Sequence, residues 1–386
     1  MIKASQGMKG IAVINKGFER VCADEIKEIL GKKTKVEEKS GFVLFDFKDF
    51  EEIFTLCYKS QSASQIFLLL NQFPLNDSST ALSKIDFSGW LGKAFSIQCV
   101  KTGEADEEIS SQEIAQDFGA AIAGKTGTNA VYKNADTNFV ALVSSKTCYF
   151  GVDFSAEDLG RRDYRIFVGN KSLKGNVAYS LIRLAGFDSK KALFDPFCGS
   201  GEIPIEAALF ATGFSPRHYS KDKFPFRKLS QFEKFDFDSF FSKLDKHAKL
   251  ETKTQITALD RNFKFVNQSQ KNAKIAGIVK KIDFSRLELE WLDTKFKKSS
   301  VDCFVTIPIQ PSKSLAPDFV EKIYKEIFFQ LEFILAKDGK AVFAVRKGPA
   351  IELLKKHAEA KKFAVSDERE FWVGKETWTA VVFEKK

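Results

Sequence analysis

The residues best suited to chemistry lie at positions 192–208, where an apolar run ends in an acidic residue and a glycine-rich turn follows. This order of residue types predicts a strand, a tight turn and the start of a helix. Gly199 and Gly201 can adopt positive φ and bring bare backbone close to a ligand. Pro204 falls in the first helical turn, whose unpaired N–H groups can bind a polar or anionic ligand. The spacing differs from G-x-G-x-x-G, which argues against a dinucleotide.

This turn resembles the first motif of S-adenosylmethionine-dependent methyltransferases, in particular those that methylate exocyclic amines of nucleic-acid bases. The resemblance implies S-adenosylmethionine as the cofactor. It implies cofactor contacts from Asp195, Phe197, Cys198, Gly199, Ser200 and Gly201. A purely structural strand-to-helix turn is the alternative interpretation.

Two later acidic residues are candidates for the rest of a cofactor site. Asp260 ends the predicted strand 255–260, and an acid at that place in a βαβ unit can accept both ribose hydroxyls. Its alternative role is to cap the next helix. Asp283 lies at the third such position and could accept the amine of an adenine, although a single loop aspartate is often only solvated.

The predicted helix 173–185 precedes the glycine-rich turn. In the resembled family this helix closes over the methionine end of the cofactor, which implies contacts from Lys174 and Asn176. A helix that only packs is the alternative.

The predicted strand 301–306 ends in Ile307, Pro308, Ile309 and Gln310. The resembled family has Asn or Asp, Pro, Pro and an aromatic residue there. In that tetrad an oxygen accepts a hydrogen of the amine, and the aromatic ring stacks on the flipped base.

This degenerate tetrad lacks both features, because Ile307 cannot accept a hydrogen bond and Gln310 stacks poorly. Losing one oriented polar group costs about 2.7–4 kcal/mol, or roughly 10²–10³ in rate. The backbone carbonyls of Ile307 and Pro308, or the side chains of Thr306 and Gln310, could supply an oxygen instead.

Two basic segments are candidates for RNA contacts. Arg161, Arg162 and Arg165 could contact phosphates, or could form ordinary salt bridges in a solvated linker. Residues 213–238 alternate basic and aromatic residues, with Arg217, Lys223 and Arg227 as phosphate contacts. This insertion resembles one in guanine-N2 methyltransferases of tRNA and ribosomal RNA. Its phenylalanines could instead simply anchor it.

The elements that position these residues suggest an α/β protein in several domains. Residues 1–75 read as a ferredoxin-like domain with the order β-α-β-β-α-β. Residues 76–155 resemble a THUMP domain, an RNA-binding module, and residues 156–172 read as a linker. Residues 173–386 predict a Rossmann-like, doubly wound, mostly parallel sheet with an antiparallel last strand, as in methyltransferases.

Composition limits the other possibilities. The chain has 386 residues, a formal net charge of +9 and scattered cysteines without a C-x-x-C pair. We therefore expect a cytoplasmic, reduced protein with no metal and no membrane span, and we expect a monomer. The excess of positive charge suits a polyanionic partner.

The resemblance to these families implies an RNA methyltransferase that forms N2-methylguanosine in structured RNA, with tRNA favoured over ribosomal RNA. The degenerate tetrad leaves a second hypothesis open, a homologue that binds the cofactor and RNA but transfers methyl groups poorly. A DNA amine methyltransferase is disfavoured, because the N-terminal half resembles an RNA binder.

Overall fold

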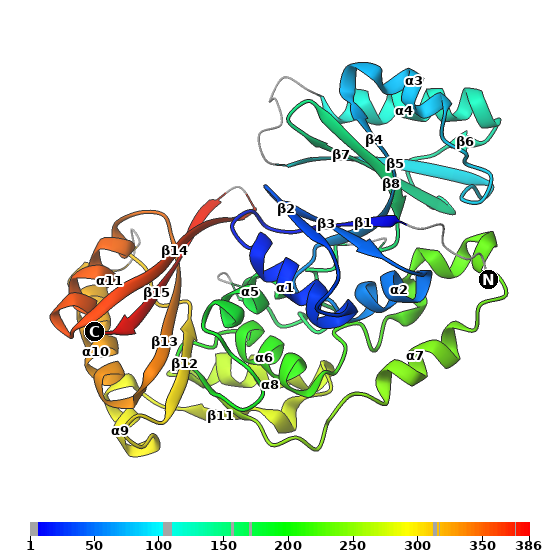
Figure 1. The fold of residues 1–386 in the computed structure, drawn as a ribbon. Coiled ribbons are helices and arrows are strands. Elements are labelled where there is room, and N and C mark those ends of the chain that lie inside the picture. The colour runs from blue at the N-terminus through cyan, green and yellow to red at the C-terminus, as the bar shows by residue number, and fades with distance from the viewer. Residues whose placement is uncertain are drawn as a thin grey trace. The chain divides into compact units, whose positions relative to one another are not determined.

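The computed structural model describes residues 7–102, 110–155, 158–169, 172–311, 315, 317–374 and 376–386. The described chain divides into two compact units (Figure 1). Unit 1 comprises Met1–Leu159 with Arg217–His247, and unit 2 comprises Gly160–Pro216 with Ala248–Lys386. Residues 217–247 were predicted within the methyltransferase domain, but they pack with unit 1.

The first part of unit 1 has the predicted β-α-β-β-α-β order. Its elements are β1 (Met8–Val13), α1 (Glu19–Leu30), β2 (Val36–Lys39), β3 (Phe42–Phe47), α2 (Phe50–Lys59) and β4 (Gln65–Pro74). Strand β1 is antiparallel to both β3 and β4. Asp49 is the N-cap of helix α2, and its carboxylate accepts the Glu52 N–H at 3.0 Å.

The second part of unit 1 continues the same sheet. Its elements are η1 (Leu75–Asp77), α3 (Ser78–Ser83), β5 (Ala94–Thr102), α4 (Ser111–Thr126), β6 (Asn129–Ala130), β7 (Thr137–Ser144) and β8 (Thr147–Asp153). The strand order is β2-β3-β1-β4-β8-β7-β5-β6. Strand β4 pairs with β1 on one side and β8 on the other, so the sheet crosses the predicted boundary at residue 75. One apolar cluster likewise includes Ile11 of β1 and Val140 of β7.

The inserted segment 217–247 contains η2 (Lys221–Lys223), η3 (Pro225–Lys228), η4 (Ser230–Phe232) and α7 (Phe237–Asp245). Its rings pack on α2: the Phe54 centroid lies 4.4 Å from Phe226 and 5.0 Å from Phe232. Burial of these rings places the segment in unit 1. In unit 2, the Lys249 N–H donates to the Thr212 carbonyl at 2.7 Å. The chain therefore leaves unit 2 before residue 217 and returns to it after residue 247 at neighbouring positions.

Unit 2 is a doubly wound sheet, as predicted, with the strand order β11-β10-β9-β12-β13-β15-β14. The five strands β9 to β13 are parallel to their neighbours among themselves. Strand β15 runs antiparallel to both β13 and β14. The strands are β9 (Ala192–Asp195), β10 (Gln255–Asp260), β11 (Asp283–Arg286), β12 (Val301–Thr306), β13 (Leu335–Arg346), β14 (Phe363–Val373) and β15 (Glu376–Lys385).

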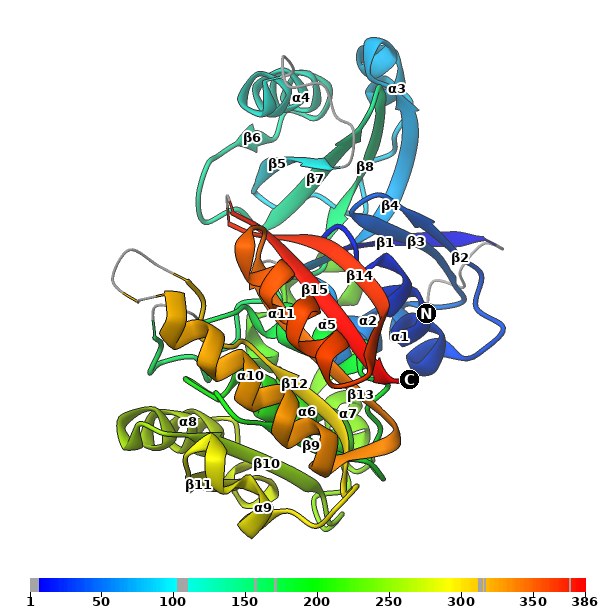
Figure 2. The same ribbon diagram turned by 90° about the vertical axis from the view of Figure 1, so that its left-hand side faces the viewer.

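Helices cover both faces of this sheet. They are α5 (Gly175–Leu184), α6 (Glu202–Thr212), α8 (Phe263–Ile275), α9 (Leu292–Lys295), α10 (Pro317–Ile334) and α11 (Pro349–Ala360), with short turns η5 (Val279–Lys281) and η6 (Leu289–Trp291). Helices α10 and α11 lie along one face and α5 and α6 along the other (Figures 1 and 2). The buried cluster on the α10 side includes Tyr324, Phe328, Phe343 and Phe383. Helices therefore cover both faces of the sheet. In folds of this type, ligands bind at the carboxyl ends of the parallel strands.

Candidate functional site

A cavity of about 530 Å³ lies at the carboxyl ends of β9, β10 and β12. Its walls come from the glycine-rich turn, the start of α6, the β10–α8 turn and the segment after β12. Its lining residues are Val168, Gly169, Ser172, Leu173, Asp195, Phe197, Cys198, Gly199, Ser200, Glu202, Ile203, Asp260, Arg261, Asn262, Lys264, Phe265, Gln268, Ile307 and Ile309. The structure thus brings together the predicted motif residues except Gly201, along with Asp260 and part of the degenerate tetrad.

The glycine-rich turn has the backbone that its sequence predicts. Gly199 has φ of 51° and Gly201 has φ of 90°, conformations that favour glycine. A Cβ at position 201 would lie 2.2 Å from the Ser269 Oγ, so α8 packs directly against the turn. The Cys198 N–H donates to the Leu259 carbonyl at 2.8 Å, which ties the turn to β10.

The start of α6 is acidic, which favours the polar rather than the anionic of the two ligand types expected at this helix end. Glu202 occupies the first turn of α6, is 6% exposed and accepts the Ser200 hydroxyl at 2.9 Å. Glu202 also pairs with Arg165 at 3.2 Å. A carboxylate already compensates the helix dipole here, so a neutral or cationic ligand group fits better than an anion.

Asp195 and Asp260 add two further carboxyl groups to the cavity lining. Burial raises the pKa of Asp195 to about 7, although its Oδ1 accepts the Thr306 hydroxyl at 2.6 Å. Burial also raises the pKa of Asp260. A positive charge beside either carboxyl group would favour its ionised form, so a cationic ligand suits this part of the cavity.

Asp260 links the two turns of the site. Its carboxylate accepts the Asn262 N–H at 2.8 Å and the Gly199 N–H at 3.4 Å. The alternative role as a helix cap is wrong, because Asn262 is the N-cap of α8 and accepts the Lys264 N–H at 3.0 Å.

The expected adenine contact from Asp283 is wrong, because the register places Asp283 at the opposite end of its strand. Asp283 pairs with Thr257 and Arg286 pairs with Asp260, so Asp283 lies three residues, or about 10 Å, from the carboxyl edge. Its side chain is 60% exposed and pairs with Lys295 at 2.7 Å.

Glu288, not Asp283, is the acidic residue that follows the carboxyl end of β11, although it does not line the cavity. It follows β11 at the carboxyl edge and lines a small groove with Arg261, Asn262, Phe263 and Arg286. Burial is the main cause of the raised pKa of Asp260, and the charge of Glu288 adds to it. Counting to the end of the third strand, rather than to its first acid, would have found this residue.

The expected cofactor contacts from Lys174 and Asn176 are not supported, because neither side chain lines the cavity. Lys174 is exposed at the N-cap of α5, and Asn176 is 1% exposed. The preceding Ser172 and Leu173 line the cavity instead. A Cβ at Gly175 would lie 2.5 Å from the Arg162 Cγ, so the start of α5 packs closely against Arg162.

The degenerate tetrad divides between the cavity and the core. Ile307 and Ile309 line the cavity and make this wall apolar. Gln310 is 7% exposed, and its Oε1 accepts the Arg346 N–H at 2.8 Å, so this oxygen is committed to β13. Thr306 is fully buried and donates to Asp195. Neither side chain lines the cavity, so the expected rescue by their oxygens is not present in this conformation.

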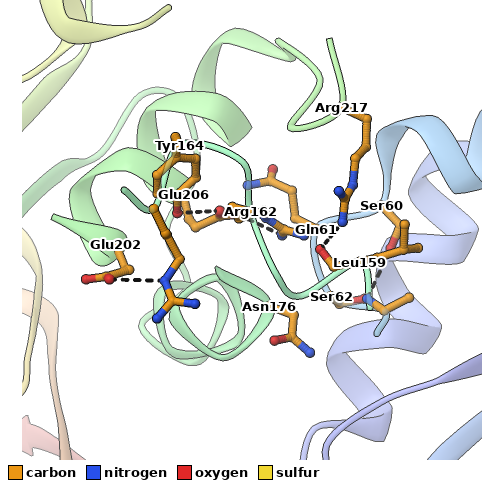
Figure 3. A network of polar contacts seen from close by, with 12 residues as sticks. Ser60, Gln61, Ser62, Leu159, Arg162, Tyr164, Asn176, Glu202, Glu206 and Arg217 are labelled. Atoms are coloured by element: carbon orange, nitrogen blue, oxygen red, sulfur yellow. Dashed lines mark hydrogen bonds and ion pairs between the residues drawn. The ribbon is translucent and has the colours of Figure 1, made fainter. Parts of the chain in front are cut away.

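The predicted phosphate contact from Arg162 is wrong. Arg162 and Glu206 are both fully buried and form a two-pronged pair, with Nε–Oε1 at 2.8 Å and Nη2–Oε2 at 3.0 Å. Tyr164 also donates to Glu206 at 2.8 Å, and Figure 3 shows both side chains directed at this carboxylate. Arg165 is committed to Glu202 and to the Ser172 hydroxyl. Arg161 is exposed.

The predicted phosphate contact from Arg217 is also wrong. Arg217 is 5% exposed and donates to the Leu159 carbonyl at 2.5 Å (Figure 3). Lys223 is exposed, and Arg227 pairs with Asp238 at 3.0 Å. The interpretation of the phenylalanines as anchors is confirmed, because the Phe226 and Phe232 side chains are buried against α2.

The part of the chain that the structure describes contains no group of three or more His, Cys, Asp or Glu side chains arranged to hold a metal ion. None of its described helices combines the length and apolar character needed to cross a bilayer.

Comparisons with known proteins agree with this geometry. The family model described as RMKL-like, methyltransferase domain matches residues 162–374, more than half of the chain. The tRNA (guanine(6)-N2)-methyltransferase of Methanocaldococcus jannaschii is 26% identical over 347 residues, covering 85% of this chain and 88% of that protein. The ribosomal RNA large subunit methyltransferase K/L of Vibrio parahaemolyticus is 25% identical over 291 residues, covering 72% of this chain and 40% of that protein.

Solved structures show the same fold over nearly the whole chain. SMU.472, solved in complex with SAH, has a TM-score of 0.78 and 19% identity, with 99% of each chain covered. TrmN from Thermus thermophilus has a TM-score of 0.70 and 20% identity, covering 98% of this chain and 100% of that one.

Proposed function

This chain belongs to the family of RMKL-like methyltransferase domains, and we propose that it transfers a methyl group from S-adenosylmethionine to N2 of a guanine in structured RNA. The observation that carries the proposal is the cavity between the Gly199–Gly201 turn, Asp260 and Ile307. The relatives named for guanine-N2 methylation of tRNA and for ribosomal RNA methylation support this substrate class. We favour tRNA, because the tRNA relative matches along most of both chains.

The residues present fit S-adenosylmethionine. Gly199 lines the cavity without a side chain, and Gly201 allows α8 to pack directly against the turn. Asp260 would accept the ribose hydroxyls, and Glu288, which lines a separate groove beside Asn262, would accept the adenine amine. Asp195 and Glu202 would balance positive charge. When bound, this cofactor would supply a methyl group on a sulfonium: the amine nitrogen would bond to the methyl carbon as the C–S bond breaks and the thioether leaves.

At the transfer end, the chain would act mainly by positioning its substrates. Ile307 and Ile309 supply an apolar wall that excludes water, and backbone carbonyls next to them are the remaining acceptors for the guanine amine. No step here needs a metal.

A weakly active or inactive binding protein is the second candidate, and a specific observation favours it. Ile307 provides no acceptor, and the Gln310 oxygen is held by the Arg346 N–H. Such a protein would bind the cofactor and RNA through the same surfaces. Arg161 and Lys223, both exposed, stay candidates for RNA contacts in either case. We also propose that the chain acts as a monomer.

The decisive experiment is incubation with methyl-labelled S-adenosylmethionine and unmodified total tRNA or ribosomal RNA, followed by mass spectrometry of the nucleosides. Label in N2-methylguanosine from tRNA supports the enzyme. Binding of both ligands without transfer supports the second candidate. Transfer to another nucleoside would reject the guanine-N2 assignment.

The variant Asp260→Ala tests the cofactor site. We expect it to weaken cofactor binding while RNA binding is preserved, because Asp260 belongs to unit 2 and lines the cofactor cavity. Unchanged cofactor affinity, measured by calorimetry, would remove Asp260 from the site.

A further inference from the structure

A groove of about 620 Å³ lies in unit 1, where the end of α1 approaches the β3–α2 turn. Lysines dominate its rim: Lys32, Lys33 and Lys35 come from the turn after α1, and Lys48 follows β3. The turn is built by Gly31, which has φ of 114° and whose carbonyl accepts the Thr34 N–H at 3.0 Å. The buried Phe47 forms part of the floor.

The charge of this lysine groove is positive. Among the described residues, four lysines line it against two carboxylates, Asp46 and Glu52. Glu52 is already engaged, because its Oε2 accepts the Lys48 N–H at 2.7 Å and its Oε1 pairs with the Lys48 Nζ at 3.4 Å. In the described chain Lys32, Lys33 and Lys35 form no ion pair, and all three are exposed. Three neighbouring ammonium groups without carboxylate partners attract anions.

The lining favours a polyanion over a small molecule. Small-molecule sites have a few precisely placed polar groups, whereas four lysines line this groove and their charges sit on long flexible stems. Lysine is a point charge that tolerates varied geometry, which suits contacts to a repeating phosphate backbone without sequence readout.

We propose that the lysine groove binds the sugar–phosphate backbone of the RNA substrate. This inference rests on the proposed function, since it names the part of unit 1 that would hold the same RNA. Contacts of this kind add affinity and orientation, and they are independent of the methylated base.

The test compares two triple variants of the full-length chain. The first, Lys32→Gln/Lys33→Gln/Lys35→Gln, removes the groove charges. The control, Lys297→Gln/Lys298→Gln/Lys337→Gln, removes three exposed lysines of unit 2. Binding of unmodified total tRNA is measured against salt concentration, with cofactor affinity and circular dichroism as checks on folding.

We expect the groove variant to bind tRNA at least about tenfold more weakly near physiological salt, with a salt slope lower by about 2 to 3. The control should bind as the wild type does, and both should keep cofactor affinity. An equal loss of tRNA affinity in both variants, or no loss in the groove variant, would reject the lysine groove as an RNA-binding site while the proposed function stands. Failure of the wild type to bind any structured RNA would instead overturn the proposed function, and with it the RNA occupant.

Discussion

Ile307 lines the cavity, and the sequence resemblance predicts it at the position where the family tetrad has a hydrogen-bond acceptor. We predict that Ile307→Asn raises the rate of methyl transfer to tRNA by about tenfold or more, because it restores an oriented oxygen at the amine. Cofactor affinity should not change. Ile309→Asn, which alters another lining isoleucine, should give no gain. A rate for Ile307→Asn at or below that of the wild type would reject this register for the end of β12.

Asp195 should make cofactor binding depend on pH. Its pKa of about 7 in the free protein means that the buried carboxyl is protonated below neutrality. A sulfonium favours the ionised form, so affinity for S-adenosylmethionine should rise by up to about tenfold between pH 6 and 8, with release of a proton. Calorimetry in buffers of different ionisation enthalpy measures both effects.

Two controls isolate Asp195. S-adenosylhomocysteine lacks the sulfonium charge and should show a smaller pH dependence, and Asp195→Asn should flatten it. The pKa of this carboxyl is raised by folding, so its contribution to stability is greatest at low pH and is lost as the pH rises through about 7. Asp195→Asn should therefore stabilise the cofactor-free protein relative to wild type above pH 7. An identical pH profile in wild type and variant would exclude Asp195.

At the scale of elements, the Arg162–Glu206 pair joins the segment before α5 to helix α6. Both side chains are fully buried, so Arg162→Ala would leave an uncompensated carboxylate. We predict a loss of about 3–5 kcal/mol in the free energy of unfolding, measured by urea denaturation. The apolar double variant Arg162→Met/Glu206→Leu should recover much of it.

The neighbouring Arg161 is the matched control for this pair. It is exposed, so Arg161→Ala should change stability by little. A variant Arg162→Ala with wild-type stability, but with a lower salt slope for tRNA binding, would restore the phosphate contact first expected from the sequence.

At the scale of the whole molecule, residues 217–247 lie between two segments of unit 2 in the sequence, but they pack in unit 1. Phe54 of α2 contacts the rings of Phe226, Phe232 and Phe237 of this segment. We predict that Phe54→Ala loosens the segment and exposes it to limited trypsin cleavage within 217–247, at a cost of about 3–5 kcal/mol in unit 1. Cofactor affinity should be preserved, because the cavity belongs to unit 2.

Phe118→Ala is the control for this experiment. Phe118 is also buried in unit 1, but its recorded ring contacts are with Phe73 and Phe150. It should lower stability without directing cleavage to 217–247. The same cleavage pattern from both variants would show that the segment is not held through Phe54.

The sequence by itself determined the features that depend on neighbouring residues. Positive φ at Gly199 and Gly201, the β-α-β-β-α-β order of the first part of unit 1 and the alternation of strands and helices in unit 2 follow from local composition and periodicity. These signals act over one turn or one strand, so they can be recognised without knowing the partners.

Only the tertiary structure decided which polar side chains face a ligand. The pairing of β10 with β11 sets which acid reaches the carboxyl edge, Glu288 instead of Asp283. The partner of Arg162 lies 44 residues away, and the acceptor of Arg217 lies 58 residues away, so neither commitment is visible in a local pattern. The local sequence does not distinguish a solvent-exposed charged side chain from one that is buried in an ion pair, because burial is a property of the assembled core.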